Sequence, residues 1–477
     1  MNLVQDLFKN TGILTLSQII TNIMGFFWTT LYARYLGVAD FGVINFAIAT
    51  MSVATIFMDV GMSTYIVRDI SRNEKLTNKY LGNMVPLKIF LSSSTVLCII
   101  LILKVMNYPN IVILISLIFG IQTAIMNMNG LFYGVFQAFR KMKYQAFGSI
   151  INSTFLLSFV VIAIELDLGI VSIALAYLIS IVIAAIYSVK SIRKIVKDVG
   201  IQFDFKFWVE TMKNAAPFGL TALFSSIFFT TDQVMLGSIS GDYALGVYSA
   251  AYRILTVFIT IYTMYTVAIF PLMSNLYKNS DNILKITYEK SVKYLLGLVL
   301  PICVGISFYA NDIVVLIFGK DYIIVGSVLQ LLIWNLVFTF MNGVSDSLLN
   351  STNHEVGVTK RTAIAGVFNF ALNLIVISKF SYYGATISTL ISGLLIVILN
   401  SYLISKSVFK LNFSLLIDII KILVSTSILT VVLYLIKVSI WIAIPIGFIT
   451  YSLAIVVTKT LDSSDKYILK ELLGKNN

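Results

Sequence analysis

Long apolar runs separated by short polar stretches follow one another along the whole chain. A helix needs about 20 consecutive, mostly apolar residues to cross the hydrocarbon core of a membrane. By that rule the pattern predicts about fourteen membrane-spanning segments, at residues 11–36, 41–65, 81–103, 110–135, 146–165, 169–189, 214–237, 243–271, 291–310, 323–349, 361–379, 383–405, 413–436 and 438–458. We therefore expect an all-α, polytopic membrane protein.

The composition excludes an ordinary soluble protein. Of the 477 residues, 58% are hydrophobic and only 12% are charged, and the mean hydropathy is +0.93. Soluble domains carry about 25% charged residues, so this chain has too few polar side chains to cover a surface that faces water. Its outer surface must face lipid, where a helix satisfies its own backbone hydrogen bonds.

The net charge of +12 comes from short basic clusters between the apolar segments. Such a distribution is typical of the positive-inside rule, and it does not favour a nucleic-acid partner. When the termini and every second loop are placed in the cytoplasm, that side holds 26 lysine and arginine residues and the opposite side holds 4. We therefore expect a multi-pass protein of the cell membrane with both termini in the cytoplasm.

Short motifs recur at a spacing of about 200 residues. Gly37 and Gly42 mark the junction of the first two predicted helices, and Gly237 and Gly246 mark the junction of the seventh and eighth. Both repeats begin on the cytoplasmic side, as in transporters built from two parallel six-helix halves. The sequence therefore predicts three parts: a six-helix lobe over 1–205, a second six-helix lobe over 206–405, and two additional helices with a cytoplasmic tail over 406–477.

Several predicted helices carry polar residues along one face; the stripe of the second helix, for example, contains Asn45, Ser52 and Asp59. Inside a membrane such a face must be hidden from lipid, against another helix or in a water-filled cavity. Ordinary packing explains a single stripe, whereas matched stripes in two halves favour a central hydrophilic cavity. The candidate cavity residues of the stripes are Gln18, Asn22, Asp59, Asp232, Arg253, Thr256 and Thr260.

Arg253 is the most informative of these residues, because it lies about ten residues, or roughly 15 Å, into its helix. An arginine at that depth costs at least ~2.5–3.5 kcal/mol if it faces lipid. It must therefore face a partner, water or an anionic ligand. The guanidinium fork suits a phosphate or diphosphate. An ion pair with Asp232 on the preceding helix is the alternative, and both can hold.

Two other charged residues, Arg34 and Asp59, have both a structural and a functional interpretation, whereas Asp346 has a structural one only. Arg34, near the outer end of the first helix, can line the cavity or reach the membrane interface. Asp59 can couple to an ion, or it can pair with a nearby base such as Arg68. Asp346 lies near the cytoplasmic end of its helix, where we expect it to be solvated.

Signatures of enzymes are missing from the sequence. It contains no G-x-x-x-x-G-K-[ST], H-E-x-x-H or G-x-S-x-G run, which would mark a P-loop ATPase, a zinc protease or a hydrolase. One histidine and two cysteines offer no metal-binding spacing. Short outward loops argue against a membrane-embedded polymerase or glycosyltransferase. We expect no enzyme activity, no cofactor and no metal site, and Na⁺ or H⁺ stays open as a coupling ion.

Four motifs follow one another along the chain, and they are Arg34-Tyr35-Leu36-Gly37 with Phe41-Gly42, Asp59-Val60-Gly61-Met62, Thr231-Asp232-Gln233-Val234-Met235-Leu236-Gly237, and Gly246-Val247-Tyr248-Ser249-Ala250-Ala251-Tyr252-Arg253. In this order and spacing they resemble polysaccharide flippases of the Wzx or RfbX type. Those proteins belong to the multidrug/oligosaccharidyl-lipid/polysaccharide exporter superfamily. The resemblance covers essentially the whole chain.

The resemblance implies two six-helix lobes of the MATE-type fold around a central cavity, alternating access, and a lipid-linked oligosaccharide as cargo. Cationic residues of the cavity would meet the diphosphate; Arg253 matches that role by motif, and Arg34 matches it less closely. Membrane lipids and polysaccharide-assembly enzymes are the implied partners. The alternative is a cation-coupled multidrug antiporter of the same fold, for which Asp59 would supply a carboxylate.

Overall fold

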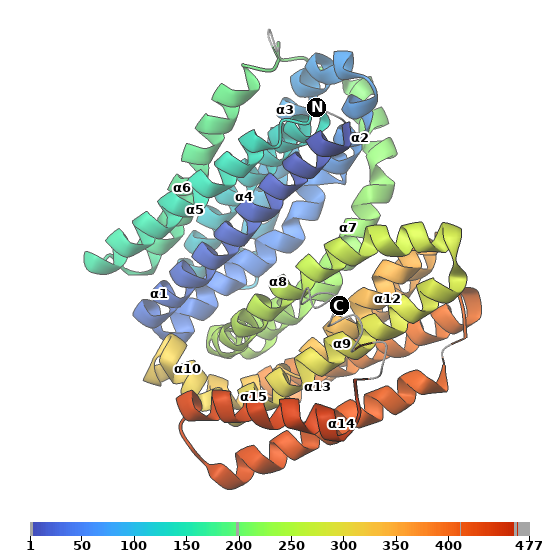
Figure 1. Cartoon of the computed structure of the whole chain (residues 1–477). Coiled ribbons are helices and arrows are strands. Elements are labelled where there is room, and N and C mark those ends of the chain that lie inside the picture. Colours follow the sequence, from blue (N-terminus) through green and yellow to red (C-terminus); the bar gives the residue numbers. More distant parts are fainter. Residues whose placement is uncertain (1–2, 197–199, 411, 462–464, 466–477) are drawn as a thin grey trace. The chain divides into compact units, whose positions relative to one another are not determined.

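The computed structural model of the chain describes residues 3–196, 200–410, 412–461 and 465 (Figure 1). Within these residues the chain forms fifteen α-helices, two short 3-10 helices and no strand. Eleven of the helices are long and apolar enough to cross a membrane. The predicted all-α, polytopic membrane protein is confirmed.

Two of these helices are too long for one crossing. At 1.5 Å per residue, α1 (Leu3–Asp59) with 57 residues and α13 (Glu355–Ser407) with 53 residues far exceed a hydrocarbon core of roughly 30 Å. Each is broken by one non-helical residue: Gly37 in α1 has φ 75° and ψ 176°, and Ser381 in α13 has φ 50° and ψ −128°. Both breaks fall between two predicted segments, so each long helix accounts for two of them.

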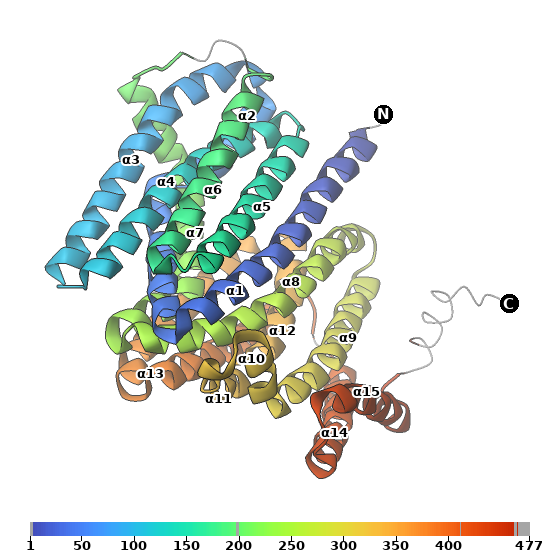
Figure 2. The same ribbon diagram turned by 90° about the vertical axis from the view of Figure 1, so that its left-hand side faces the viewer.

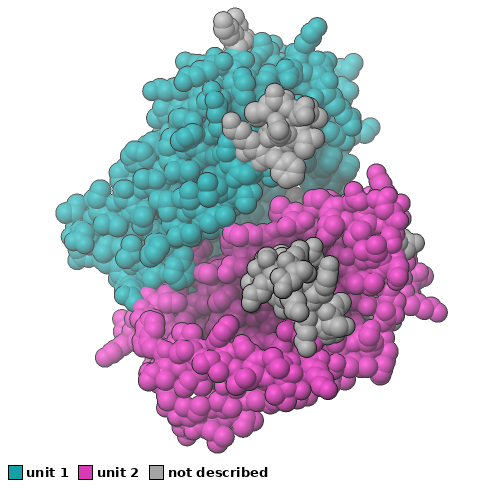
Figure 3. Space-filling model, viewed as in Figure 1, with its two compact units in different colours: residues 1–250, 370–385 teal, residues 251–369, 386–477 magenta. Residues whose placement is uncertain are grey.

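The chain divides into two compact units, which Figure 3 colours separately. Unit 1 comprises residues 1–250 and 370–385. Within it, α3, α4, α6 and α5 pack in sequence, and α1 packs against both α4 and α5 (Figure 2). The helices of unit 1 are α1, α2 (Met62–Arg72), α3 (Thr77–Val105), α4 (Asn110–Ala138), α5 (Lys143–Glu165), α6 (Gly169–Ile192), α7 (Phe205–Ser240), the start of α8 (Asp242–Asn279) and a middle stretch of α13.

Unit 2 comprises residues 251–369 and 386–477. In this unit α9 packs against α12 and α14, and α14 packs against α15. The predicted tail after residue 461 lies outside the described residues except for Asp465. The two units are defined by contacts between residues, whereas the two lobes were predicted from a repeat in the sequence. The units therefore do not test the lobes, which stay a prediction. The helices of unit 2 are the rest of α8 and α13, α9 (Asp281–Phe308), α10 (Ala310–Phe318), α11 (Val325–Leu332), α12 (Asn335–Ser351), α14 (Phe413–Ile436) and α15 (Ile440–Val457).

Two elements differ from their predicted extents. α9 begins at Asp281, well before the apolar run that starts at residue 291, because the Ser280 hydroxyl caps it by accepting the Ile283 N–H over 3.4 Å. The segment predicted at 323–349 is divided into α11 and α12, which meet around Trp334. The apolar pattern reports the part of a helix inside the membrane, and it does not report polar turns that extend beyond it.

The glycines that mark the sequence repeat pack together within unit 1. A Cβ atom on Gly42 would lie 1.8 Å from the carbonyl oxygen of Asp242, and a Cβ atom on Gly246 would lie 2.0 Å from that of Val38. The two contacts are equivalent under the repeat, because Val38 and Gly42 precede Asp242 and Gly246 by the same 204 residues. Glycine at both positions lets the backbones of α1 and α8 cross this closely.

Candidate functional site

A buried ion pair joins four helices of unit 1 where α1 ends. The ammonium of Lys88 on α3, a residue that is 0% exposed, pairs with the carboxylate of Asp59. It also donates to the hydroxyl of Ser63 on α2 over 3.1 Å and to the side-chain oxygen of Asn127 on α4 over 2.6 Å. The Ser63 hydroxyl in turn donates to Asp59 over 2.6 Å. A charge withdrawn from both water and lipid requires this dense pairing.

The expected pairing of Asp59 with a base is therefore found, but the base is Lys88 and not Arg68, which was one example of such a base. The Arg68 guanidinium instead lies 5.0 Å from the centre of the Tyr65 ring and 5.3 Å from that of the Phe218 ring. Lys88 escaped the sequence analysis although a signal was present. A single lysine inside an apolar segment is expensive unless it is paired, and that cost marks it as a residue of interest.

Asp232 on α7 is buried, and it accepts hydrogen bonds within unit 1. The side-chain amide of Asn373 donates to it, and the Tyr248 hydroxyl donates over 3.3 Å. These partners come from α13 and α8. The suggested ion pair between Asp232 and Arg253 stays a prediction.

Arg253, Thr256 and Thr260 lie on one face of α8 in unit 2. Thr256 donates to the backbone carbonyl of Arg253 over 2.6 Å, and Thr260 donates to that of Thr256 over 2.9 Å. Arg253 is half-buried, and its Nε has no hydrogen-bond partner among the described residues. A guanidinium N–H that is buried and unpaired is a donor that a ligand can satisfy.

Gln18, Asn22 and Arg34 lie on α1 before its break at Gly37. The Gln18 amide donates to the side-chain oxygen of Asn22 over 2.9 Å, so these two residues pair along their own helix. Arg34 is exposed. The structure thus groups the predicted residues by helix: Gln18 with Asn22, and Arg253 with the two threonines.

A second ion pair lies in unit 2 and gives a partner to Asp346, whose side chain is 35% exposed. The carboxylate of Asp346 on α12 pairs with the buried guanidinium of Arg361 on α13. The Asn400 amide also donates to Asp346 over 3.3 Å. Asp346 is therefore held in a polar network and also stays accessible to solvent, as its position near the helix end led us to expect.

A third cluster of charges joins α9 to the end of the described chain. Lys293 is buried and pairs with Asp465 over 2.7 Å and with Asp418 on α14 over 3.3 Å. Lys290 pairs with Asp465 over 2.5 Å. Both lysines lie on α9, close to residue 291, where the predicted apolar segment begins.

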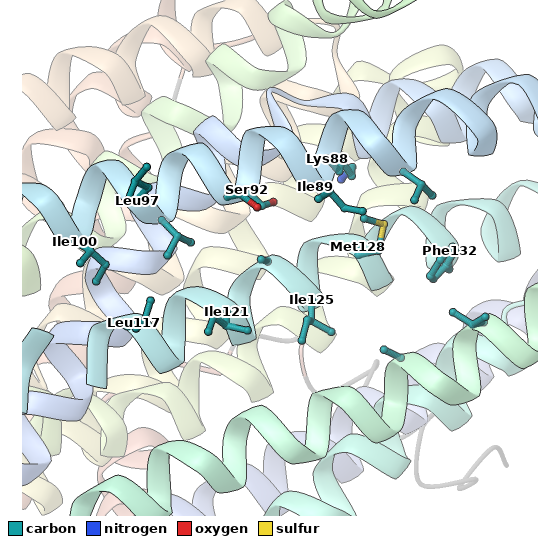
Figure 4. Close-up of a pocket in the computed structure, with 16 residues that line it drawn as sticks. Lys88, Ile89, Ser92, Leu97, Ile100, Leu117, Ile121, Ile125, Met128 and Phe132 are labelled. Carbon is teal, nitrogen blue, oxygen red and sulfur yellow. The ribbon is translucent and has the colours of Figure 1, made fainter. Parts of the chain in front are cut away.

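An apolar groove of about 690 Å³ lies beside Lys88, between α3, α4 and α6 (Figure 4). The ammonium of Lys88 is engaged by Asp59, so its aliphatic stem is the part that can line the groove. Ser92 contributes a hydroxyl, and most of the other lining side chains are aliphatic, such as Leu97 and Ile121. This lining suits a hydrocarbon chain and not a sugar or a phosphate.

The described residues include no group of three or more His, Cys, Asp or Glu side chains that could hold a metal ion. Asp59 at the end of α1 and Asp232 on α7 are the two carboxylates of the predicted cavity residues. Asp59 is neutralised by Lys88, whereas Asp232 has a tyrosine hydroxyl and an asparagine amide as partners. A cation at Asp59 would have to displace a buried ammonium.

Comparison with protein families gives two matches. The family described as "Polysaccharide biosynthesis protein" matches residues 7–277, which is more than half of the chain. The family described as "MatE" matches residues 217–378.

Two curated proteins are similar in sequence. The "Probable low-salt glycan biosynthesis flippase Agl15" of Haloferax volcanii is 23% identical over 197 residues, 41% of this chain and 42% of that protein. The "Uncharacterized membrane protein MJ1068" of Methanocaldococcus jannaschii is 26% identical over 139 residues, 29% of this chain and 27% of that protein. The match spans less than half the length of either relative.

Solved structures show the same fold. The lipid II flippase MurJ in an inward closed conformation matches with a TM-score of 0.78 at 17% identity, covering 94% of this chain and 99% of that one. An inward-facing multidrug resistance transporter of the MATE family matches with a TM-score of 0.65 at 15% identity, covering 81% of this chain and 94% of that one. The MATE-like fold is thereby confirmed.

Proposed function

Because the chain belongs to the family of polysaccharide biosynthesis proteins, we propose that it is a flippase for a polyprenyl-diphosphate-linked oligosaccharide. It would move this cargo from the cytoplasmic to the outer leaflet of the cell membrane by alternating access, in the assembly of a surface glycan. Agl15 and MurJ, which resemble it in sequence and in fold, are both named as flippases. Both termini would face the cytoplasm, and enzymes of glycan assembly would be its partners.

Arg253 carries this proposal. Its guanidinium lies within a membrane-spanning helix, and its buried Nε has no hydrogen-bond partner among the described residues. A diphosphate offers the acceptor oxygens that a guanidinium fork binds in pairs. Thr256 and Thr260, on the same face of α8, keep hydroxyl lone pairs that sugar or lipid hydroxyls can reach.

The second candidate is a cation-coupled multidrug antiporter of the MATE type. It is supported by the match to the MatE family over residues 217–378, and a buried carboxylate at Asp232 would suit a cationic drug or a coupling cation. An arginine such as Arg253 would repel a cationic drug, which is why we place the flippase first. Transport by either kind of protein would be driven by a Na⁺ or H⁺ gradient, with Asp232 as the candidate site of coupling.

The direct test is a flipping assay in proteoliposomes that contain a fluorescent polyprenyl-diphosphate oligosaccharide. Charge-assisted hydrogen bonds contribute about 1.5–3 kcal/mol, so Arg253→Ala is expected to lower the transport rate by about ten-fold or more. Arg253→Lys should restore part of the rate, because it keeps the charge and loses the fork. Arg72→Ala is the matched control, since Arg72 is an exposed arginine at the end of α2.

Three results would count against the proposal. Normal transport by Arg253→Ala would remove Arg253 from the site. A folded wild-type protein that exports cationic dyes under Na⁺ or H⁺ gradients, and does not flip the lipid-linked cargo, would establish the antiporter instead. Sugar transfer by the purified protein in detergent would show an enzyme, which the proposal excludes.

A further inference from the structure

A small pocket with a largely apolar surface and several polar groups lies in unit 1 between α1, α4 and α6. It has a volume of about 200 Å³, and none of the eight residues that line it is charged. A water molecule takes about 30 Å³ in the liquid, so the pocket has the volume of about seven water molecules. This volume suits one sugar ring and is too small for an oligosaccharide. Four of its residues have polar side chains, Ser52, Thr55, Gln122 and Thr123, and two have aromatic rings, Phe119 and Tyr177.

The polar groups of the pocket offer both acceptors and a donor. Ser52 and Thr55 donate their own hydroxyl protons to backbone carbonyls of α1 over 2.8 and 3.0 Å, which leaves their lone pairs available as acceptors. Gln122 accepts from the Thr123 hydroxyl over 3.2 Å, and its amide N–H₂ makes no hydrogen bond to a described residue. Hydroxyl groups, which donate and accept, match such a mixed set better than an anion or a cation does.

The aromatic rings form a fixed wall of the same pocket. The Phe119 and Tyr177 rings lie 5.2 Å apart between their centres. The indole N–H of Trp28 donates to the Tyr177 hydroxyl over 3.1 Å, which holds that ring in place. A ring face of this kind buries the apolar C–H face of a sugar while hydroxyl and amide side chains bind its edge.

The position of these polar groups within spanning helices makes the pocket informative. Ser52 and Gln122 are accessible, and they lie inside the candidate spans Asn10–Asp59 and Asn110–Ala138. The Ser52 hydroxyl is paired within its own helix, whereas the Gln122 amide N–H₂ makes no hydrogen bond to a described residue. An unpaired donor that faces lipid is unfavourable, so Gln122 favours contact with water or a polar ligand. The aromatic wall favours a ligand with an apolar face over water alone, and the absence of charge among the eight lining residues favours a neutral one.

We propose that this pocket binds one neutral sugar residue of the cargo glycan, with the ring against Tyr177 and Phe119 and its hydroxyl groups on Ser52, Thr55 and Gln122. The proposal rests on the proposed flippase function and deepens it. It adds a specificity site for the glycan that is chemically distinct from the cationic site at Arg253. A charged sugar such as a uronic acid would be excluded, because its carboxylate would find no cation in the pocket.

The test measures sugar binding separately from transport. The purified protein in lipid nanodiscs, without sugar-based detergent, is titrated with methyl glycosides of glucose, N-acetylglucosamine and glucuronic acid, and binding is followed by saturation-transfer NMR. We expect at least one neutral glycoside to bind and the glucuronide not to bind. One hydrogen bond contributes about 0.5–1.5 kcal/mol to the binding free energy. Losing one in Gln122→Leu or in Ser52→Ala should therefore weaken binding by about five-fold.

The matched control is Gln137→Leu, because Gln137 also lies on α4, bonds to Gln145 over 2.9 Å and does not line the pocket. Unchanged binding in Gln122→Leu and in Ser52→Ala, or no binding of any neutral glycoside by the wild type, would overturn the proposal. Failure of the flippase function would appear in the flipping assay alone, so the two failures can be told apart.

Discussion

Replacing Lys88 with methionine is expected to destabilise the protein strongly, because it leaves a carboxylate without its charge partner inside the membrane-spanning part of the fold. Methionine matches the length of the lysine stem, so packing along the apolar groove is largely kept. The change then reports mainly on the charge. The side chain of Asp59 would keep the Ser63 hydroxyl, which donates over 2.6 Å, and two longer contacts from the Ser63 N–H, at 3.2 and 3.3 Å.

The magnitude follows from how far each partner is buried. Removing one member of a buried ion pair costs about 3–5 kcal/mol. The Asp59 side chain is 18% exposed and keeps the donors of Ser63, so Lys88→Met should fall near the lower end, about 3 kcal/mol. Lys88 is 0% exposed, so Asp59→Asn should fall in the upper half of this range, about 4.5 kcal/mol. In Asp59→Asn the unpaired Lys88 could instead lose its proton, which costs about 4.6 kcal/mol at pH 7 for an unperturbed lysine. The loss of stability in this variant therefore cannot exceed that value.

The double variant separates the charge from the packing. In Lys88→Met combined with Asp59→Asn both charges are gone, so most of the stability should return, to within about 1 kcal/mol of the wild type. The assay is reversible unfolding in mixed micelles, followed by circular dichroism, for the wild type, both single variants and the double variant. Lys104→Met is the control, because Lys104 is exposed on the same helix α3.

A loss below about 1 kcal/mol in both single variants would refute the reasoning, because it would place the pair in the range of solvent-exposed ion pairs. A double variant as unstable as the sum of the two singles would also refute it. That result would show that the residues act independently and not as a pair.

Two other predictions concern close packing and the second ion pair. Gly42→Ala and Gly246→Ala should each destabilise the protein by about 1–3 kcal/mol or more, because the new Cβ atoms would lie 1.8 and 2.0 Å from a backbone oxygen. Gly12→Ala is the control and should not destabilise it, because nothing lies within 4 Å of the new Cβ atom. Thermal unfolding in detergent measures all three variants. Arg361→Met should lower stability by about 1–2 kcal/mol, because the remaining Asp346 side chain is 35% exposed and can be solvated when its partner is lost. Adding Asp346→Asn should restore most of this loss, and unfolding of the double variant at the level of the single one would contradict the pairing.

The polar part of the candidate site was only partly predictable. The stripe on the second helix led to Ser52 and Asp59, because a 3.6-residue period can be read from one segment alone. The partners of these residues could not be predicted in the same way. Lys88 is 29 residues from Asp59 on another helix, and Gln122 lies on α4, whose polar positions are scattered in an otherwise apolar run.

The sequence by itself determined the membrane class of this protein, its helical segments and the spacing of its repeat. Each of these depends on the hydrophobicity and order of nearby residues, and the breaks at Gly37 and Ser381 fell where the apolar runs end. The tertiary structure alone decided that Lys88 pairs with Asp59, and it placed Lys293 in a buried cluster. Such pairings depend on which helix faces which, because the desolvation cost of a charge is met by whichever donor or acceptor the packing brings within about 3 Å.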